Sequence, residues 1–175
     1  MAEENFKVVL TGNESVGKTS LIRRVVQNEF DEKYKPTLGF DLSLKYLDID
    51  TQSIVFSIWD LGGQMNFAPL RKNYYQGAQG FLLVFSVADA LSFKNLHYWV
   101  QEIKASCPDA PIVLVANKAD KDEWQVTLEE IEQKCTDLGL NGNAITSAKT
   151  GEGIETAFEM LGRLILSWMK SMINQ

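Results

Sequence analysis

The chain has 175 residues, enough for one domain with a substantial hydrophobic core that needs no disulfides or structural metals. Hydrophobic residues make up 45% and charged residues 23%, and no stretch reaches the roughly 18 consecutive apolar residues of a membrane span. Lys and Arg number 17 against 23 Asp and Glu, and the net charge of −6 argues against nucleic acid or an anionic membrane surface as a general partner.

The two cysteines and the two ends of the chain give expectations about where in the cell the protein resides. Cys107 and Cys135 are far apart and lack metal-ligand spacing, which is typical of reduced thiols in a reducing compartment. Ala2 stands where N-myristoylation requires glycine, and the last five residues contain no cysteine for prenylation. We therefore expect a cytoplasmic monomer with no lipid anchor in this chain, although a chain shortened at its C-terminus would look the same.

The first part of the chain alternates β-like runs with a helix and a long loop. Residues 6–10 form a mostly apolar run that predicts a strand, and residues 17–26 are compatible with a helix. Residues 28–39 are polar and contain Pro and Gly, which predicts a loop, and loops this long in compact domains are usually functional. Apolar alternation over 42–46 and a second β-like run over 54–58 predict an antiparallel hairpin.

The remainder alternates helices and strands after an irregular segment over 60–64. Apolar spacing and unbroken apolar runs predict, in order, a helix over 69–75, a strand over 80–86, a helix over 92–106, a strand over 112–116, a helix from Thr127, a strand over 144–147 and a helix over 154–172. Thr127 with Glu130 three residues later is a capping-box pattern. This alternation predicts an α/β fold: an open, mostly parallel sheet with helices on both faces and a ligand at the carboxyl ends of the strands.

Residues 12–19 match the phosphate-binding pattern G-x-x-x-x-G-K-[ST] at every fixed position and lie between a predicted strand and a predicted helix. The glycines let the backbone aim N–H groups at phosphate oxygens. Lys18 can neutralise β- and γ-phosphates, Thr19 can offer its hydroxyl to Mg²⁺, and the helix N-terminus adds positive potential. The stretch therefore predicts a nucleotide-phosphate cradle with Mg²⁺.

Asn117-Lys118-Ala119-Asp120 follows a predicted buried strand and indicates which base is bound. The Asp120 carboxylate can accept hydrogen bonds from N1–H and N2–H₂ of guanine, whereas adenine presents a lone pair at N1. The quartet therefore favours GTP and GDP. An ATP-using P-loop enzyme remains an alternative only if Asp120 has no role, and competition between ATP and GTP would separate the two.

With these motifs in order, the chain resembles a Ras-superfamily small GTPase over essentially its whole length. The resemblance implies a single P-loop NTPase G domain over 1–175, with a six-stranded sheet, one antiparallel edge strand and helices on both faces. It implies that Thr37 is the switch I threonine, which senses Mg²⁺ and γ-phosphate, and that Asp60 begins switch II. By the same matching, the Gly63 N–H binds γ-phosphate and Gln64 orients the attacking water.

The resemblance also supplies a full set of site residues, in which Phe30 packs against guanine and Ser147 begins the last base loop. The implied catalytic residues are Gln64, Lys18, Thr37 and Gly63, and the implied metal ligands are Thr19, Thr37 and Asp60. The implied nucleotide contacts are Glu14, Ser15, Val16, Gly17, Lys18, Thr19, Ser20, Phe30, Tyr34, Thr37, Gly63, Asn117, Lys118, Asp120, Ser147, Ala148 and Lys149.

Several stretches resemble Rab proteins in particular: residues 38–42, Trp59 and residues 74–78. Of the aromatic triad read by Rab effectors, Trp59 and Tyr74 are present, and Leu42 replaces the usual Phe. Residues 61–63, Leu-Gly-Gly, differ from the Thr-Ala-Gly of Rab and Ras and resemble the Gly-Gly of Arf and Gα. The resemblance implies an exchange factor, an activating protein and effectors that bind the switches at the surface of Leu42, Trp59 and Tyr74.

The function implied is a GTP-binding molecular switch that hydrolyses GTP slowly and changes its switch conformation to control effector binding. The alternative is a binding module that holds nucleotide with negligible turnover. Retention of Gln64, Thr37 and Lys18 favours the switch. The nucleotide found after purification, and its rate of phosphate loss with Mg²⁺, would discriminate between them.

Overall fold

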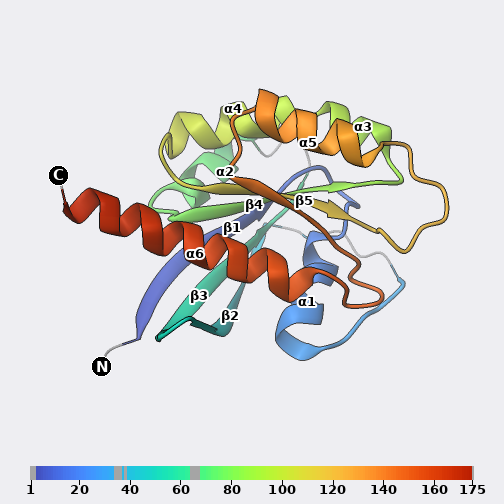
Figure 1. The fold of residues 1–175 in the computed structure, drawn as a ribbon. Coiled ribbons are helices and arrows are strands. Elements are labelled where there is room, and N and C mark those ends of the chain that lie inside the picture. Colours follow the sequence, from blue (N-terminus) through green and yellow to red (C-terminus); the bar gives the residue numbers. More distant parts are fainter. Residues whose placement is uncertain (1–2, 34–36, 38, 64–67, 175) are drawn as a thin grey trace.

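The computed structural model describes residues 3–33, 37, 39–63 and 68–174. Tyr34 and Gln64, which we expected at the nucleotide and at the attacking water, lie outside these described residues. The described strands form a six-stranded sheet in the order β2-β3-β1-β4-β5-β6 (Figure 1). Only the β2–β3 pair is antiparallel, which confirms the predicted mostly parallel sheet with one antiparallel edge strand.

The strands begin and end near their predicted positions. They are β1 (Glu4–Thr11), β2 (Phe40–Ile49), β3 (Gln52–Leu61), β4 (Gly80–Ser86), β5 (Ile112–Asn117) and β6 (Gly142–Ile145). The β2–β3 hairpin is longer than predicted because its turn is confined to residues 50–51, where Asp50 takes a left-handed φ of 55°. β6 begins and ends two residues before the predicted 144–147.

The helices are α1 (Lys18–Gln27), α2 (Ala68–Tyr75), α3 (Ala90–Lys94), α4 (Leu96–Ser106), α5 (Leu128–Asp137) and α6 (Ile154–Ile173). The predicted single helix over 92–106 is wrong. Asp89 caps the N-terminus of a separate short helix, its side chain accepting from the N–H groups of Leu91 and Ser92, and Asn95 separates α3 from α4. The predicted Thr127–Glu130 capping box is confirmed at α5.

Alternate residues of the central strands enter two cores, one on each face of the sheet. Phe6, Val8 and Leu10 of β1 pack with residues of α1 and α6, whereas Val9 packs with residues of α2, α4 and α5. Figure 1 shows α6 crossing in front of the sheet, α1 at the lower right, and α3, α4 and α5 above the sheet. The two helical layers hold the carboxyl ends of β1, β4 and β5 together on the side where α1 begins, and α6 ends on the opposite side (Figure 1).

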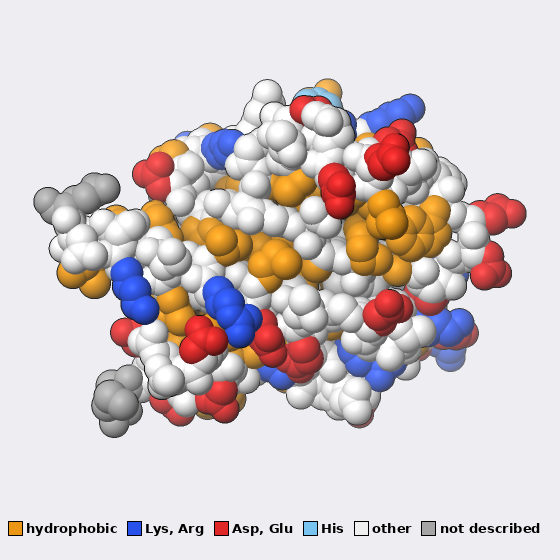
Figure 2. Space-filling model, viewed as in Figure 1, with side chains coloured by type: hydrophobic (Ala, Val, Ile, Leu, Met, Phe, Trp, Pro, Cys, Tyr) orange, Lys and Arg blue, Asp and Glu red, His pale blue; other side chains and the backbone are white. Residues whose placement is uncertain are grey.

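The surface in view is mixed in character. Figure 2 shows acidic and basic side chains interspersed around a band of hydrophobic side chains that lies between α6 and the helices above it. Among the described residues, no helix has the length and apolar content needed to cross a membrane.

Candidate functional site: a nucleotide pocket at the strand ends

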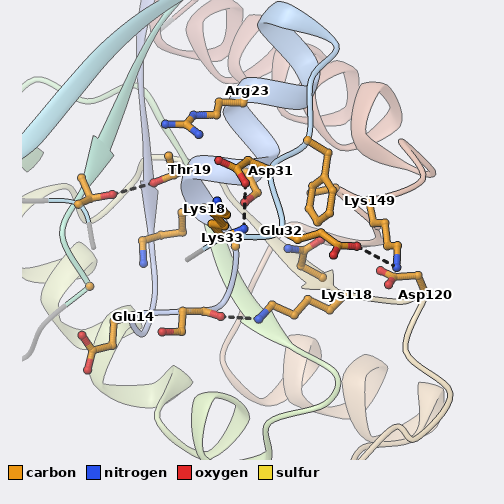
Figure 3. A pocket seen from close by; sticks show the side chains of 18 of the residues that line it. Glu14, Lys18, Thr19, Arg23, Asp31, Glu32, Lys33, Lys118, Asp120 and Lys149 are labelled. Atoms are coloured by element: carbon orange, nitrogen blue, oxygen red, sulfur yellow. Dashed lines mark hydrogen bonds and ion pairs between the residues drawn. The ribbon is translucent and has the colours of Figure 1, made fainter. Parts of the chain in front are cut away.

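A cavity of about 520 Å³ lies at the carboxyl ends of the strands (Figure 3). This volume is within the usual range for small-molecule sites, roughly 300–1,000 Å³. The sequence-predicted residues that line it are Glu14, Ser15, Gly17, Lys18, Thr19, Ser20, Phe30, Thr37, Gly63, Asn117, Lys118, Asp120, Ala148 and Lys149. Val16 and Ser147 are fully buried behind its wall, and Asp60 lines a smaller neighbouring cavity with Arg23 and Asp41.

The loop between β1 and α1 depends on two glycines with positive φ. At Gly12, with φ 139°, an added Cβ would lie 2.0 Å from the Val84 carbonyl oxygen. At Gly17, with φ 100°, it would lie 2.3 Å from Asn117 Nδ2. Since no side chain fits at either position, the loop can run closely over the end of β4 and beside Asn117. This close approach brings the N-terminus of α1 to the cavity.

Lys18 is buried at the start of α1, with its ammonium against the loop. Lys18 Nζ donates to the carbonyl oxygens of Gly12 at 2.9 Å and Asn13 at 2.7 Å. Burial lowers the pKa of Lys18 to about 8, and the negative charge of Asp60 opposes this shift. The site therefore holds a desolvated cation that an anionic phosphate would stabilise.

Oxygen atoms from three segments meet beside Lys18. Thr19 Oγ1 donates to Asp60 Oδ2 at 2.5 Å and lies 2.7 Å from Thr37 Oγ1. Asp60 Oδ1 is buried and has no hydrogen-bond partner among the described residues. Burial raises the pKa of Asp60, against the lowering effect of its hydrogen bond from Thr19. Two hydroxyls and a carboxylate with an unused buried oxygen fit Mg²⁺, which takes few protein oxygens together with phosphates.

The opposite end of the cavity is fastened to the phosphate loop by side chains at the end of β5 and in the loop that follows it. Asn117 Nδ2 donates to the Val16 carbonyl oxygen at 2.9 Å. Lys118 Nζ donates to the Ser15 carbonyl oxygen at 2.6 Å (Figure 3). Ser147 Oγ donates to Asp120 Oδ1 at 2.7 Å. These bonds fix the Asp120 carboxylate at the end of the cavity away from Lys18, where a base would lie.

The start of switch II lies against both switch I and the phosphate loop. Gly62 N–H donates to the Gly39 carbonyl oxygen at 3.1 Å, and a Cβ on Gly62 would lie 2.8 Å from the Thr37 carbonyl oxygen. A Cβ on Gly63 would lie 2.5 Å from both the Gly12 carbonyl oxygen and the Glu14 nitrogen. Both glycines are therefore needed for this close packing.

The aromatic surface beside the switches differs from the predicted one. Phe40 stacks on Trp59 with ring centroids 5.0 Å apart and lies 4.8 Å from the Tyr74 ring, while Trp59 and Tyr74 are 5.8 Å apart. Leu42 pairs with Trp59 in the ladder and is 48% exposed, but Phe40 supplies the third ring. Extending the 42–46 alternation by one step would have placed Phe40 on the same face.

A second group of contacts was missed from the sequence. Trp99 is buried on α4, and its Nε1 donates to Asn13 Oδ1 of the phosphate loop at 2.8 Å. The Arg71 guanidinium lies 4.5 Å from the Trp99 ring centroid, and Arg71 Nε donates to Glu102 Oε1 at 2.7 Å. α2, α4 and the phosphate loop are therefore joined directly. No local motif in the sequence marks this contact, since it joins residues far apart along the chain.

Comparison with known proteins gives consistent matches. The model of the Ras family matches residues 7–167. The chain is 39% identical to Ras-related protein Rab-9B of Mus musculus over 167 residues, which cover 93% of this chain and 83% of that protein. Ras-related protein Rab-9A of Homo sapiens shows the same identity and coverage. Ras-related protein Rab-7L1 of Rattus norvegicus is 35% identical over 162 residues, covering 89% of this chain and 79% of that protein.

Proposed function

Because the chain belongs to the Ras family, as a Rab-like small GTPase that binds GTP and GDP with Mg²⁺ and hydrolyses GTP, we propose a role for each part of its cavity. Lys18 and the phosphate-loop N–H groups hold the β- and γ-phosphates. Thr19, Thr37 and Asp60 hold Mg²⁺, which neutralises charge on the transferred phosphate. Gly63 N–H binds γ-phosphate and Gln64 orients the attacking water. The whole of residues 1–175 acts as one G domain.

The observation that carries the guanine assignment is the Ser147–Asp120 hydrogen bond of 2.7 Å in a loop tied to the phosphate loop by Lys118. An oriented carboxylate at one end of the cavity and a buried ammonium at the other match the two ends of a guanine nucleotide. Phe30 lines the cavity and supplies an apolar ring for the base.

The proposed regulation uses the switches and the aromatic surface next to them. An exchange factor and an activating protein act on the switches, and effectors bind the surface of Phe40, Trp59 and Tyr74, with Leu42 beside it. Phe40 is 44% exposed, and Trp59 and Tyr74 are partly buried. Since the three rings come from β2, β3 and α2, a rearrangement of the switches alters this surface. We place this activity in the cytoplasm and in a monomer. A nucleotide-holding module with negligible turnover is not favoured, because the family is one of GTP-hydrolysing switches.

The base assignment is tested with Asp120→Asn. The substitution removes or inverts two charge-assisted hydrogen bonds to guanine, each contributing roughly 1.5–3 kcal/mol, so GTP affinity should fall by several kcal/mol. Xanthine nucleotide, with an oxygen in place of the 2-amino group, should bind better to the variant than to the parent. Titration of both proteins with GTP and XTP measures this, and unchanged GTP affinity in the variant would exclude the role of Asp120.

A further inference from the structure

α1 ends against the loop that follows β6, and Arg24 makes the contact. Its Nε donates to the Ala148 carbonyl oxygen at 2.8 Å, and its Nη2 donates to the Lys149 carbonyl oxygen at 2.5 Å. Its Nη1 donates to Asn28 Oδ1 at 3.2 Å. All three guanidinium nitrogens therefore have acceptors, and two of these acceptors are carbonyl groups of the loop.

The bond to the Ala148 carbonyl sets the direction of the Lys149 N–H. In a planar trans peptide, the carbonyl of one residue and the N–H of the next point in opposite directions. Holding the Ala148 carbonyl toward α1 therefore turns the Lys149 N–H away from α1. In the part of the chain that the structure describes, neither the Ala148 N–H nor the Lys149 N–H has an acceptor, and both residues line the cavity. The next N–H, of Thr150, is already bound to Ser147 Oγ at 3.1 Å.

We infer that Arg24 is a positioning residue for guanine recognition, which holds this loop so that the free N–H of Lys149, beside that of Ala148, faces O6 of the base. The inference rests on the proposed guanine site. Guanine presents an acceptor, O6, beside its N1–H donor, and the ionised Asp120 carboxylate can only accept. A donor for O6 must therefore come from another group. The loop is suitably placed, because its Ser147 hydroxyl already contacts Asp120.

Arg24 lies on the same helix, α1, as the residues that face the phosphates. Lys18 and Thr19 stand in the first turn of α1, and Arg24 stands in its last turn. Arg24 follows Lys18 by six positions, which is about 9 Å along the helix axis at 1.5 Å per residue. The first turn of α1 therefore positions the phosphate end of the cavity, and its last turn, through Arg24, positions the base end. Loss of the Arg24 bonds should therefore act on base recognition and leave phosphate recognition in place.

The test compares nucleotides altered at single positions of the base. 6-Thio-GDP has sulfur, a weak acceptor, in place of O6, and IDP lacks the 2-amino group that Asp120 reads. Affinities of GDP, 6-thio-GDP and IDP are measured by competition against a fluorescent GDP. For Arg24→Met, GDP affinity should fall about tenfold, and the preference for GDP over 6-thio-GDP should fall by a similar factor, as expected for loss of well-placed hydrogen bonds. The preference for GDP over IDP should not change.

The matched control is Lys45→Met. Lys45 Nζ donates to the Val25 carbonyl oxygen at 3.2 Å, near the same end of α1, without a bond to the base loop. This variant should keep both preferences. Hydrogen exchange of the amides of Ala148 and Lys149 in the GDP complex gives a second readout, which should quicken in Arg24→Met only.

The outcomes separate the inference from the function it rests on. If Arg24→Met keeps its preference for GDP over 6-thio-GDP while Asp120→Asn loses the preference for GDP over IDP, the inference is wrong and the guanine site stands. If Asp120→Asn also keeps its preference, the guanine site itself is wrong. Should the methionine variant not fold, Arg24→Lys removes the fork of donors while keeping the charge, and the same ratios apply.

Discussion

The buried ammonium of Lys18 lowers the free energy of unfolding of the nucleotide-free protein. Its pKa is about 8 in the folded protein against 10.5 ordinarily, with burial as the largest cause. Between these pH values the unfolded chain holds more protons than the folded one, so this residue makes the free energy of unfolding rise with pH. The shift corresponds to about 3 kcal/mol, which opposes folding fully below pH 8 and disappears above pH 10.5.

We therefore predict that nucleotide-free wild type gains stability relative to Lys18→Met as pH rises from 8 to 10.5, by up to about 3 kcal/mol. Urea unfolding of both proteins across this range measures the difference. The comparison cancels other groups that titrate there, such as Lys118, whose pKa is also lowered by burial. If the free energies of unfolding of the two proteins changed in parallel with pH, the pKa of Lys18 would not be lowered in the folded protein.

Glu14 lies in the phosphate loop and lines the cavity, yet its side chain is exposed. Figure 3 shows its carboxylate turned away from Lys18. A carboxylate facing water is screened and repels the terminal phosphate only weakly. Glu14→Gly should therefore not lower intrinsic hydrolysis. The same carboxylate can trap an incoming arginine, so the chain should resist an activator whose arginine approaches γ-phosphate over this loop.

Single-turnover GTP hydrolysis by wild type and Glu14→Gly, with GTP affinity measured alongside, tests this expectation. A marked slowing with affinity intact would make Glu14 a positive contributor to catalysis and contradict it.

At the scale of elements, the packing of switch II on switch I depends on Gly62. No left-handed φ is required there, so alanine tests only the space, and its Cβ would lie 2.8 Å from the Thr37 carbonyl oxygen. A backbone atom must move to accommodate it, which would pull Thr37 Oγ1 from its position 2.7 Å from Thr19 Oγ1. Gly62→Ala should weaken Mg²⁺ binding in the nucleotide complex roughly fivefold, the equivalent of about one hydrogen bond.

The measurement is GDP release as a function of free Mg²⁺. Because the effect passes through Thr37, Gly62→Ala should add little in a Thr37→Ala background, and additive effects in this double-mutant cycle would contradict the mechanism.

The elements that could be predicted from the sequence are those specified by residues close together along the chain. Unbroken apolar runs predicted β4 and β5, and Thr127 with Glu130 predicted the start of α5. The phosphate loop could be recognised because its glycines and Lys18 have a fixed spacing. The break at Asn95 could not be predicted, since apolar spacing continues through it and only the Asp89 cap shifts the start of α3. The role of Arg24 could not be predicted either, because the two loop carbonyls that it bonds lie more than 120 residues away in the sequence.

At the scale of the whole molecule, three links connect the phosphate loop to distant surfaces. Asn117 and Lys118 connect it to the base loop, and Trp99 connects it to α4. Tyr75 of α2 adds a buried bond of 2.6 Å to Thr11 at the end of β1. This hydrogen bond ties the last turn of α2 to the carboxyl end of β1. The rings of Phe40, Trp59 and Tyr74 join this turn to β2 and β3, so we expect the bound nucleotide to be sensed at this aromatic surface.

Trp59 should report that change through its fluorescence. It lies 5.0 Å from the Phe40 ring on the neighbouring strand, and Lys7 Nζ lies 4.5 Å from its ring centroid, so a small shift of β2 or α2 changes both the packing and the charge around the indole. Exchange of GDP for a non-hydrolysable GTP analogue orders the γ-phosphate contacts of both switches and should change tryptophan emission. Trp59→Phe should abolish most of the change. If the variant keeps the full change, Trp59 is not the reporter, and Trp99→Phe then tests whether the signal comes from the indole bonded to Asn13 in the phosphate loop.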